Sequence, residues 1–387
     1  MATVSRRVLL KLTNRDLVFS LAITLITLLT LLLPTGFTSP YRTGTNTWVK
    51  ARVLETNNSL VKIIGPVKEG AQQLEIRVLS GRFKGRELSA TNLLMGKLEL
   101  DKFFSVGDTA FVVLDLSPDG KEILYPNVID HYRLDATILL MAAFALVLIA
   151  FARWTGIKAL LSFIFSGAVI IKLLLPAILK GTDPLIITFA VVTLLSFVII
   201  FLVGGFTRKG LTAFLGSLGG IGITSLLAIL FTNLFKIHGA VRPFTETLLY
   251  QGFDFLNLPH LFMAGIFLAS SGAVMDLSMD IAAAMDEIKQ KHPVISRVEL
   301  IRSGFTVGRQ VVGTMTTTLL LAYTGGYTAL MMIFMSQGIP LANIINMIYV
   351  SAELVHTMVG SFGLILVAPI TAMIGGFILG KPSRPAS

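Results

Sequence analysis

The chain has 387 residues, of which 54% are hydrophobic and 14% charged, and several apolar runs exceed the roughly 18 residues that span a bilayer, which excludes a soluble globular protein. The net charge of +10 comes from short basic clusters between the apolar runs, and no basic patch interleaved with aromatic residues exists, so we expect no nucleic-acid partner. There is no cysteine, which excludes disulfides and thiol chemistry.

The first apolar run covers residues 17–33. It is long for the hydrophobic region of a signal peptide, and the sequence PTGFTSP that follows it lacks an A-x-A cleavage site. We therefore predict an uncleaved membrane anchor within residues 1–36. Four basic residues precede the run: Arg6, Arg7, Lys11 and Arg15.

Residues 37–135 have the composition of a soluble domain. The segments WVKARVLE, QLEIRVLS and VGDTAFVVLDL alternate apolar and polar residues, which is typical of half-buried strands. Turn sequences such as SPDGKE separate these segments. We predict a small β-barrel or sandwich of five to seven strands, because strands of this length need closure or a second sheet to cover a core. Phe83, Phe103, Phe104 and Phe111 are candidates for its core or for a membrane-facing surface.

Residues 136–380 form the predicted transmembrane domain, followed by a tail at 381–387. With the anchor, the predicted fold is a polytopic α-helical membrane protein of about eight transmembrane helices, with the β-domain inserted after the first. The seven further helices are expected near 137–152, 158–179, 185–205, 211–234, 258–284, 311–336 and 350–379.

The basic residues of the connections predict the topology. They fall in every second connection, on the same side as the basic N-terminus, while the opposite short loops carry only Lys180, Lys236 and Arg242. The positive-inside rule then places both termini in the cytoplasm and the β-domain outside it. The cytoplasmic set is Arg153, Lys158, Arg208, Lys209, Lys289, Lys291, Arg297, Arg302, Arg309, Lys381 and Arg384.

Two connections have further features. Residues 241–260 are rich in aromatic residues and poor in charge, which favours a position in the membrane interface. On the cytoplasmic side, Ser296 and Glu299 have the spacing of a capping box, which predicts a short amphipathic helix.

Three motifs late in the chain resemble segments of the YibE/F-like membrane proteins. They are SSGAVMDLSMDIAAAMDEI, GRQVVGTMTTTLLLAYTGG and ELVHTMVGSFGLILVAPITA, and they follow a β-domain containing GRFKGRELSATNLL and FSVGD. An anchor, a β-domain and seven spans are also the layout of that family. The resemblance implies a protein of the bacterial cytoplasmic membrane. It implies little chemistry, although some members are regarded as exporters of small metabolites.

Asp276 and Asp280 lie near the end of a predicted span. They are four residues apart and so share a helix face, with about 6 Å of rise between them. A carboxylate at the centre of a span costs about 2.5–3.5 kcal/mol, so such residues usually face a bundle interior or a wet cavity. Two close carboxylates favour a shared proton or a cation. The alternative is that both are solvated at the cytoplasmic end or paired with Arg302 or Arg309.

Three more ionisable residues lie within predicted spans. Glu353 and His356 are three apart in the last span, where Glu353 is a candidate relay for protons. One E-x-x-H motif without a second falls short of a dimetal bundle, so we predict no metal site. Lys172 either extends its amine toward the interface or forms an internal ion pair with Asp276 or Glu353.

Thr314, Thr317 and Thr318 form a polar face ahead of Gly325 and Gly326. The glycines are candidates for a helix break that would expose backbone groups to a substrate. Alternatively, the threonines bond to their own helix and the glycines allow close packing. The segment FLGSLGGIGITS (214–225) resembles a dinucleotide loop but follows no strand, so we interpret its small residues as helix-packing positions.

The predicted function is secondary transport, namely proton- or ion-linked export of a small polar metabolite. Asp276 and Asp280 would accept protons or cations, the threonines would line the pathway, and Arg309 would be a partner at the inner gate. No P-loop, H-E-x-x-H or G-x-S-x-G motif is present, so we expect neither ATP binding nor enzymatic activity, and no cofactor. The alternatives are a non-transporting envelope scaffold whose β-domain binds a partner, and a passive channel. The expected partners are the lipid bilayer, the metabolite, a proton or cation, and further copies of the chain in a homo-oligomer.

Overall fold

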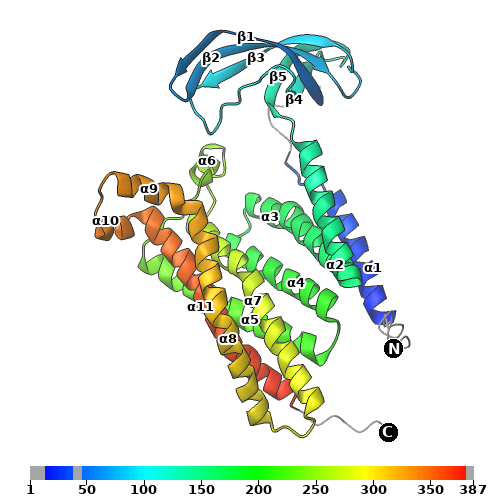
Figure 1. Ribbon diagram of the computed structural model, residues 1–387, viewed down its shortest axis with the longest axis vertical. Helices are drawn as coiled ribbons and strands as arrows, with labels where there is room; N and C mark the ends of the chain where they lie inside the picture. The colour runs from blue at the N-terminus through cyan, green and yellow to red at the C-terminus, as the bar shows by residue number, and fades with distance from the viewer. Residues whose placement is uncertain (1–13, 38–45, 381–387) are drawn as a thin grey trace. The chain divides into compact units, whose positions relative to one another are not determined.

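The computed structural model describes residues 14–37 and 46–380, and the chain divides into two compact units (Figure 1). One unit, Phe37–Val147, contains the described β-strands. The other consists of Met1–Gly36 and Leu148–Ser387 and is helical. The boundary lies inside helix α2 (Leu134–Val169), so the first turns of this helix belong to the same unit as the sheet.

The first unit is built on one antiparallel sheet of five strands in the order β3-β2-β1-β4-β5. The predicted alternation is observed: on β2, Leu74, Ile76 and Val78 are buried while Glu75 and Arg77 are exposed. The edge strands β3 and β5 contact each other, so the sheet curves until it is nearly closed. The strands are β1 (Asn46–Ile64), β2 (Val67–Val78), β3 (Glu87–Met95), β4 (Thr109–Leu116) and β5 (Ile123–His131).

The interior of this unit also has a polar contact. The side chain of Gln72 is fully buried and donates to the carbonyl of Phe104 at 2.8 Å, while the N–H of Phe104 donates back to Gln72 Oε1 at 3.1 Å. This pair of bonds fixes the connection between β3 and β4 to the sheet. Phe83 and Phe104 are therefore core residues, whereas Phe103 and Phe111 are partly buried.

The helical unit contains most of the chain's apolar residues. Six described helical segments are long and apolar enough to cross a membrane, and a shorter apolar helix covers Asp16–Leu32. The helices are α1 (Asn14–Leu32), α2 (Leu134–Val169), α3 (Leu175–Leu179), α4 (Pro184–Gly204), α5 (Arg208–Leu234), α6 (Thr245–Tyr250), α7 (Leu258–Lys291), α8 (Arg297–Thr324), α9 (Thr328–Ser336), α10 (Leu341–Asn346) and α11 (Ile348–Ile378). A π-helical turn, η1 (Ile170–Leu174), joins α2 to α3, and a 3₁₀ turn, η2 (Gly325–Tyr327), joins α8 to α9.

Two helix boundaries test the sequence predictions. Arg153 has φ 50° and ψ −122°, which breaks the 46-residue segment Leu134–Leu179 where the sequence predicts a connection between two helices. The predicted short amphipathic helix after Ser296 is wrong as a separate element, because α8 continues without interruption to Thr324. Its capping box is confirmed: Ser296 Oγ accepts from the N–H of Glu299 at 3.2 Å, and Glu299 Oε2 accepts from the N–H of Ser296 at 3.1 Å.

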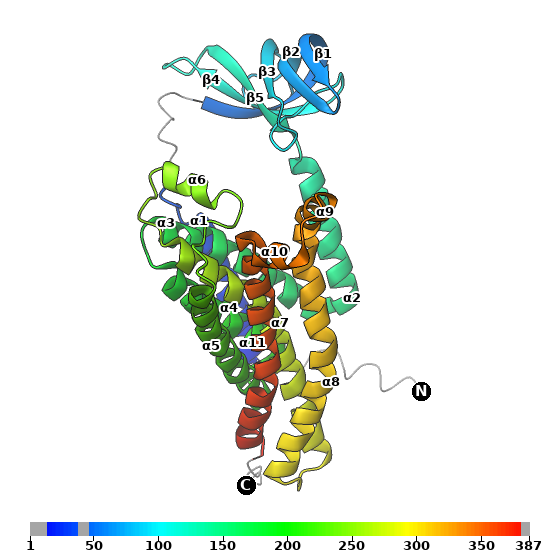
Figure 2. The ribbon, with the colours of Figure 1, turned by 90° about the vertical axis from the view of Figure 1, so that its left-hand side faces the viewer.

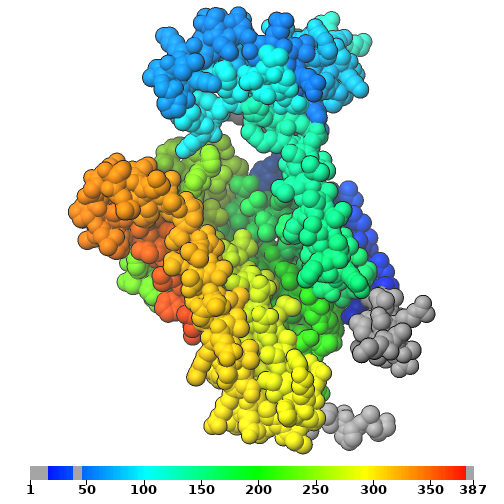
Figure 3. All heavy atoms as spheres, in the orientation of Figure 1, coloured from blue at the N-terminus to red at the C-terminus, as the bar shows by residue number. Residues whose placement is uncertain are grey.

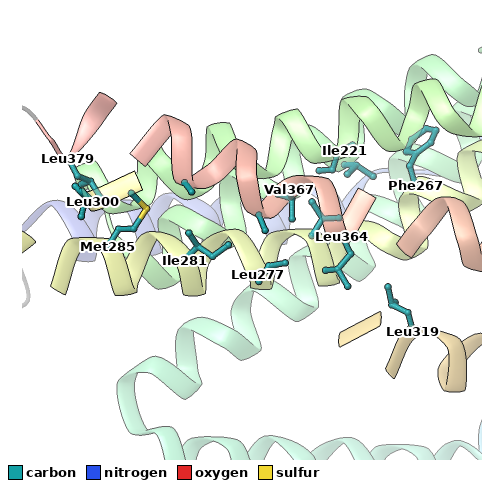
Figure 4. Packing of buried hydrophobic residues seen from close by; sticks show 14 of the residues in the cluster. Ile221, Phe267, Leu277, Ile281, Met285, Leu300, Leu319, Leu364, Val367 and Leu379 are labelled. Atoms are coloured by element: carbon teal, nitrogen blue, oxygen red, sulfur yellow. The ribbon is translucent and has the colours of Figure 1, made fainter. Parts of the chain in front are cut away.

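The centre of the helical unit is formed by α5, α7, α8 and α11 (Figures 1 and 2). Leu277 and Ile281 of α7 and Leu364 and Val367 of α11 fill the space between their helices (Figure 4). A Cβ atom on Gly220 of α5 would lie 2.8 Å from Val367 Cβ and 2.9 Å from Val274 Cγ1. The interpretation of residues 214–225 as packing positions is therefore confirmed.

Asp183 and His260 join the starts of α4 and α7. Asp183 caps α4 by accepting from the N–H groups of Leu185 and Ile186, and its Oδ2 lies 2.6 Å from His260 Nδ1. Burial opposes ionisation, but the hydrogen bonds from His260 and from the two backbone N–H groups outweigh it and hold the pKa of this carboxyl below its usual value. The stabilisation is thus present above the unfolded-state pKa and is lost as the pH falls through the depressed folded-state pKa.

We expect Asp183→Ala to lower the free energy of unfolding by about 1–2 kcal/mol, because it removes a helix cap and a charged contact. Thermal unfolding of the purified full chain at neutral pH measures the change. Asp254→Ala is the matched control: Asp254 is exposed and forms no ion pair or hydrogen bond with any described residue. Equal melting temperatures for the two variants would contradict the assigned role.

Candidate functional site

One face of α7 carries small residues and carboxylates. We call Gly265, Ala269, Gly272, Asp276 and Asp280 the acidic stripe. All five are exposed and recur every three or four residues, so they share one side of the helix. The opposite side, with Val274, Leu277 and Ile281, is fully buried in the core. The apolar periodicity of α7 therefore turns the two carboxylates away from the packed bundle, so they do not face the bundle interior, which is one of the usual positions expected for such residues from the sequence.

Neither carboxylate of the stripe has a partner among residues 14–37 and 46–380. Asp276 and Asp280 form no hydrogen bond and no ion pair there, and Arg302 and Arg309, the candidate partners, are exposed on α8 without reaching them. Glu287, further along α7, pairs with Lys291 at 2.7 Å. The two aspartates thus keep their full capacity to accept a proton, a cation or a hydrogen-bond donor.

The accessible face of α8 lies on the surface of the helical unit (Figure 3). Between Thr306 and Thr318 its exposed side chains are polar, whereas Leu320 and Leu321 further along are exposed and apolar. Gly304 and Gly308 turn the opposite face toward α7 and α11: a Cβ on Gly308 would lie 2.9 Å from Ala368 Cβ and 3.3 Å from Ile281 Cδ1. Contacts of Gly304 with Met285 and of Gly308 with Ile281 make α7 and α8 antiparallel neighbours. The exposed residues of α8 include Thr306, Arg309, Gln310, Thr314, Thr317 and Thr318.

Two of the three predicted threonines, Thr314 and Thr318, donate their hydroxyl protons within α8. Thr314 donates to the carbonyl of Val311 at 3.0 Å, and Thr318 donates to the carbonyl of Thr314 at 3.1 Å. Their oxygens remain available as acceptors only. These hydroxyl oxygens and the carboxylates of α7 are all oxygen acceptors, the type of group that suits protons and hard cations.

The α-helix is interrupted at Gly325 and Gly326. α8 ends at Thr324, the two glycines lie in the 3₁₀ turn η2, and α9 begins after Tyr327, whose φ of −108° and ψ of 3° lie outside the α-helical range. Gly325 itself keeps φ −53° and ψ −39°, so the predicted break takes the form of a tightened turn and not of an unwound segment. A Cβ on either glycine would have no atom within 4 Å among the described residues, so close packing is not observed at this position.

Lys172 lies in η1 and donates to the carbonyl of Leu33, just beyond α1, at 3.1 Å. It thus satisfies a free carbonyl at the end of a helix. The alternative of an ion pair with Asp276 or Glu353 is wrong, since each of those residues lies on another part of the bundle.

Glu353 and His356 belong to a second polar group, which also contains Arg242, Tyr323 and Tyr327 and which we call the outer cluster after the side that the topology prediction assigns to it. Arg242 Nη2 lies 3.2 Å from Glu353 Oε2 and 2.8 Å from His356 Nδ1, and its Nη1 donates to the Tyr327 hydroxyl at 3.0 Å. The rings of Tyr323 and His356 are 4.5 Å apart. The guanidinium therefore contacts both Glu353 and His356.

Sequence reasoning places Glu353 and His356 in this region but misses Arg242 and both tyrosines. Arg242 is separated from Tyr327 by 85 residues and from His356 by 114, so no local pattern links them. The available signal is that Arg242 is the one arginine of the short connections assigned to the outer side. A buried carboxylate needs a cation, and such a lone arginine is the natural candidate.

Comparisons with known proteins bear on the helical unit. No curated protein and no solved structure matches this chain. A family model described as YibE/F-like protein matches residues 140–381, which is more than half of the chain and includes the acidic stripe, the polar face of α8, Glu353 and His356. The chain therefore belongs to the YibE/F-like family.

Proposed function

We propose that this protein is a secondary transporter of the bacterial cytoplasmic membrane that exports a small polar metabolite, driven by a proton or cation gradient. Asp276 and Asp280 accept the coupling ion. Thr314, Thr317 and Thr318 line the pathway with acceptor oxygens, Glu353 relays protons on the outer side, and Arg309 serves at the inner gate.

The observation that carries the proposal is the accessible, unpartnered pair of carboxylates on a membrane-spanning helix. Charged groups in spans are costly against lipid and mark ion or substrate pathways. A carboxylate that only stabilises packing is expected in a buried ion pair. The two aspartates are instead exposed and unpaired among the described residues.

The distribution of charge supports a cytoplasmic location for the loop between α7 and α8. Asp183 meets His260 at one end of the helical unit, and Gly304 meets Met285 at the other. The second end collects the basic residues, which the positive-inside rule assigns to the cytoplasm. This orientation, with eight spans and with both termini in the cytoplasm, puts the β-domain outside. The basic residues at that end are Arg208, Lys209, Lys289, Lys291, Arg297 and Arg302.

The alternative function is a non-transporting envelope scaffold. The outer cluster favours it, because its charges are paired and mostly buried, which is typical of groups that fix a packing arrangement. A scaffold predicts no flux of any solute and a partner protein bound to the β-domain.

Flux in proteoliposomes tests the proposal. The full chain is reconstituted and loaded with a panel of small polar metabolites, and efflux is recorded with and without an imposed pH gradient. We expect efflux of at least one metabolite class that changes with the gradient. Flux that is unaffected by the gradient would indicate a passive channel, and no flux above empty vesicles for the whole panel would favour the scaffold.

A further inference from the structure

The outer cluster has the geometry of a proton-operated contact. We propose that His356 Nδ1 is a proton-binding site, and that protonation there transfers Glu353 from Arg242 to His356 and loosens the connection between α5 and α7 around Arg242. The titratable and charged groups that face His356 are Arg242 from this connection, Tyr323 of α8, Tyr327 of η2 and Glu353 of α11.

The partner of His356 fixes its protonation state. A guanidinium only donates hydrogen bonds, so Nδ1 must accept the bond from Arg242 Nη2 at 2.8 Å. His356 is therefore neutral, with its proton on Nε2. If Nδ1 gains a proton, two positively charged N–H donors face each other at this distance, and the bond to Arg242 is lost.

A second acceptor for that proton is already in place. Glu353 Oε2 lies 3.8 Å from His356 Nδ1 on the same helix. Although it is 3.2 Å from Arg242 Nη2, the alignment does not make a hydrogen bond, and this oxygen is buried without a hydrogen-bond partner among the described residues. Such an oxygen is costly to leave unsatisfied, so an Nδ1–H on His356 gains a bond that Arg242 does not supply.

The exposure of the three side chains allows Glu353 to change its partner from Arg242 to His356. Glu353 and His356 are 9% and 10% exposed, whereas the Arg242 side chain is 36% exposed. On protonation the buried pair becomes an imidazolium and a carboxylate, and Arg242 moves its charge toward solvent. The proton comes from the aqueous phase on the outer side, and no covalent bond other than N–H forms.

Because of the position of Arg242, this change of ion-pair partner affects the backbone of the connection. Gly239, at φ +85°, brings the connection against the backbone of Leu258 at the start of α7, where a Cβ atom would not fit. From there to α6, Arg242 supplies the polar side-chain contacts with α11 and η2, through Glu353, His356 and Tyr327, while the neighbouring Val241 packs in one apolar cluster with Val355 and Val359 of α11. Losing the bonds to Glu353 and His356 therefore loosens residues 242–247, whereas Val241 and Leu256 stay packed in their clusters.

Hydrogen exchange of the full chain in lipid nanodiscs tests the proposal. We expect amides of residues 242–247, corrected for the intrinsic pH effect, to exchange about tenfold faster at about pH 5.5 than at about pH 8, the size of losing a charged hydrogen bond. In His356→Asn, the side-chain amide oxygen still accepts a hydrogen bond from Arg242 but does not bind a proton, so these amides exchange slowly at both pH values. In Arg242→Ala, they exchange fast at both pH values. His238→Asn, in the same connection but exposed, should keep the wild-type response.

A pH response that persists in His356→Asn, or no response in the wild type, would overturn the proposal. Tyr327→Phe gives a second check that leaves His356 intact: it removes one acceptor of Arg242 and should raise exchange at high pH while preserving the response to acid. A Tyr327→Phe profile identical to wild type at both values would also contradict it. The readout is backbone exchange, so these outcomes do not depend on whether the chain transports.

Discussion

Asp276→Asn is expected to lower coupled efflux by about 100-fold or more, as the loss of an essential proton acceptor typically does. Asparagine keeps the size and polarity of aspartate but does not bind a proton or balance a cation. Asp276 is exposed on α7 and contributes no ion pair among the described residues, so its replacement should not disturb the packing. Efflux from proteoliposomes with equal protein content measures the effect.

Asp286→Asn is the matched control, because it makes the same change on the same helix at a residue that hydrogen-bonds Gln290 near the helix end. Its flux should equal that of the wild type. Unchanged flux in Asp276→Asn would reject the role of this residue. A drop in Asp280→Asn alone would move the coupling site one helical turn toward the cytoplasm.

Gly220→Leu is expected to destabilise the helical unit by about 3 kcal/mol or more, because overpacking a tight helix contact forces β-branched neighbours and backbones apart. A Cβ at this position already lies 2.8–2.9 Å from Val367 and Val274, and leucine adds three further carbons. Gly222→Leu, two residues along α5, is the control, since a Cβ there has no described atom within 4 Å.

Thermal unfolding and size-exclusion chromatography in detergent compare the two variants. Gly220→Leu should melt lower and aggregate, whereas Gly222→Leu should behave as wild type. Similar behaviour of both variants would mean that the contact between α5 and α11 does not determine the stability of the bundle.

Local signals in the sequence predict the features of this fold that depend on neighbouring residues. The alternation around Leu74 and Ile76 predicts a strand of the sheet, and the Ser296 capping box predicts the start of α8. The small residues near Gly220 predict a helix contact. Each of these depends on residues within a few positions of each other, so no tertiary information is needed.

Features that depend on distant residues could not be predicted in the same way. The cluster around Arg242 joins three segments, and the continuous run of α8 from Ser296 overrides a break suggested by composition alone. Asp276 is exposed because the opposite side of α7 packs against α5 and α11. The residue pattern of α7 alone does not identify these neighbouring helices, so the exposure could not be predicted from it. Lys172 likewise finds its acceptor on α1, far away in the chain.

The packing of α8 is uneven along its length, and this has a mechanical consequence. Leu300, Gly304 and Gly308 are buried in its first half, whereas Leu319 is the buried residue of its second half. Near its other end, the ring of Tyr323 lies 4.5 Å from that of His356. A rod held at both ends and loosely packed between them bends most in its middle. Thermal motion of α8 should therefore be largest between Gly308 and Leu319, the stretch that carries Thr314, Thr317 and Thr318.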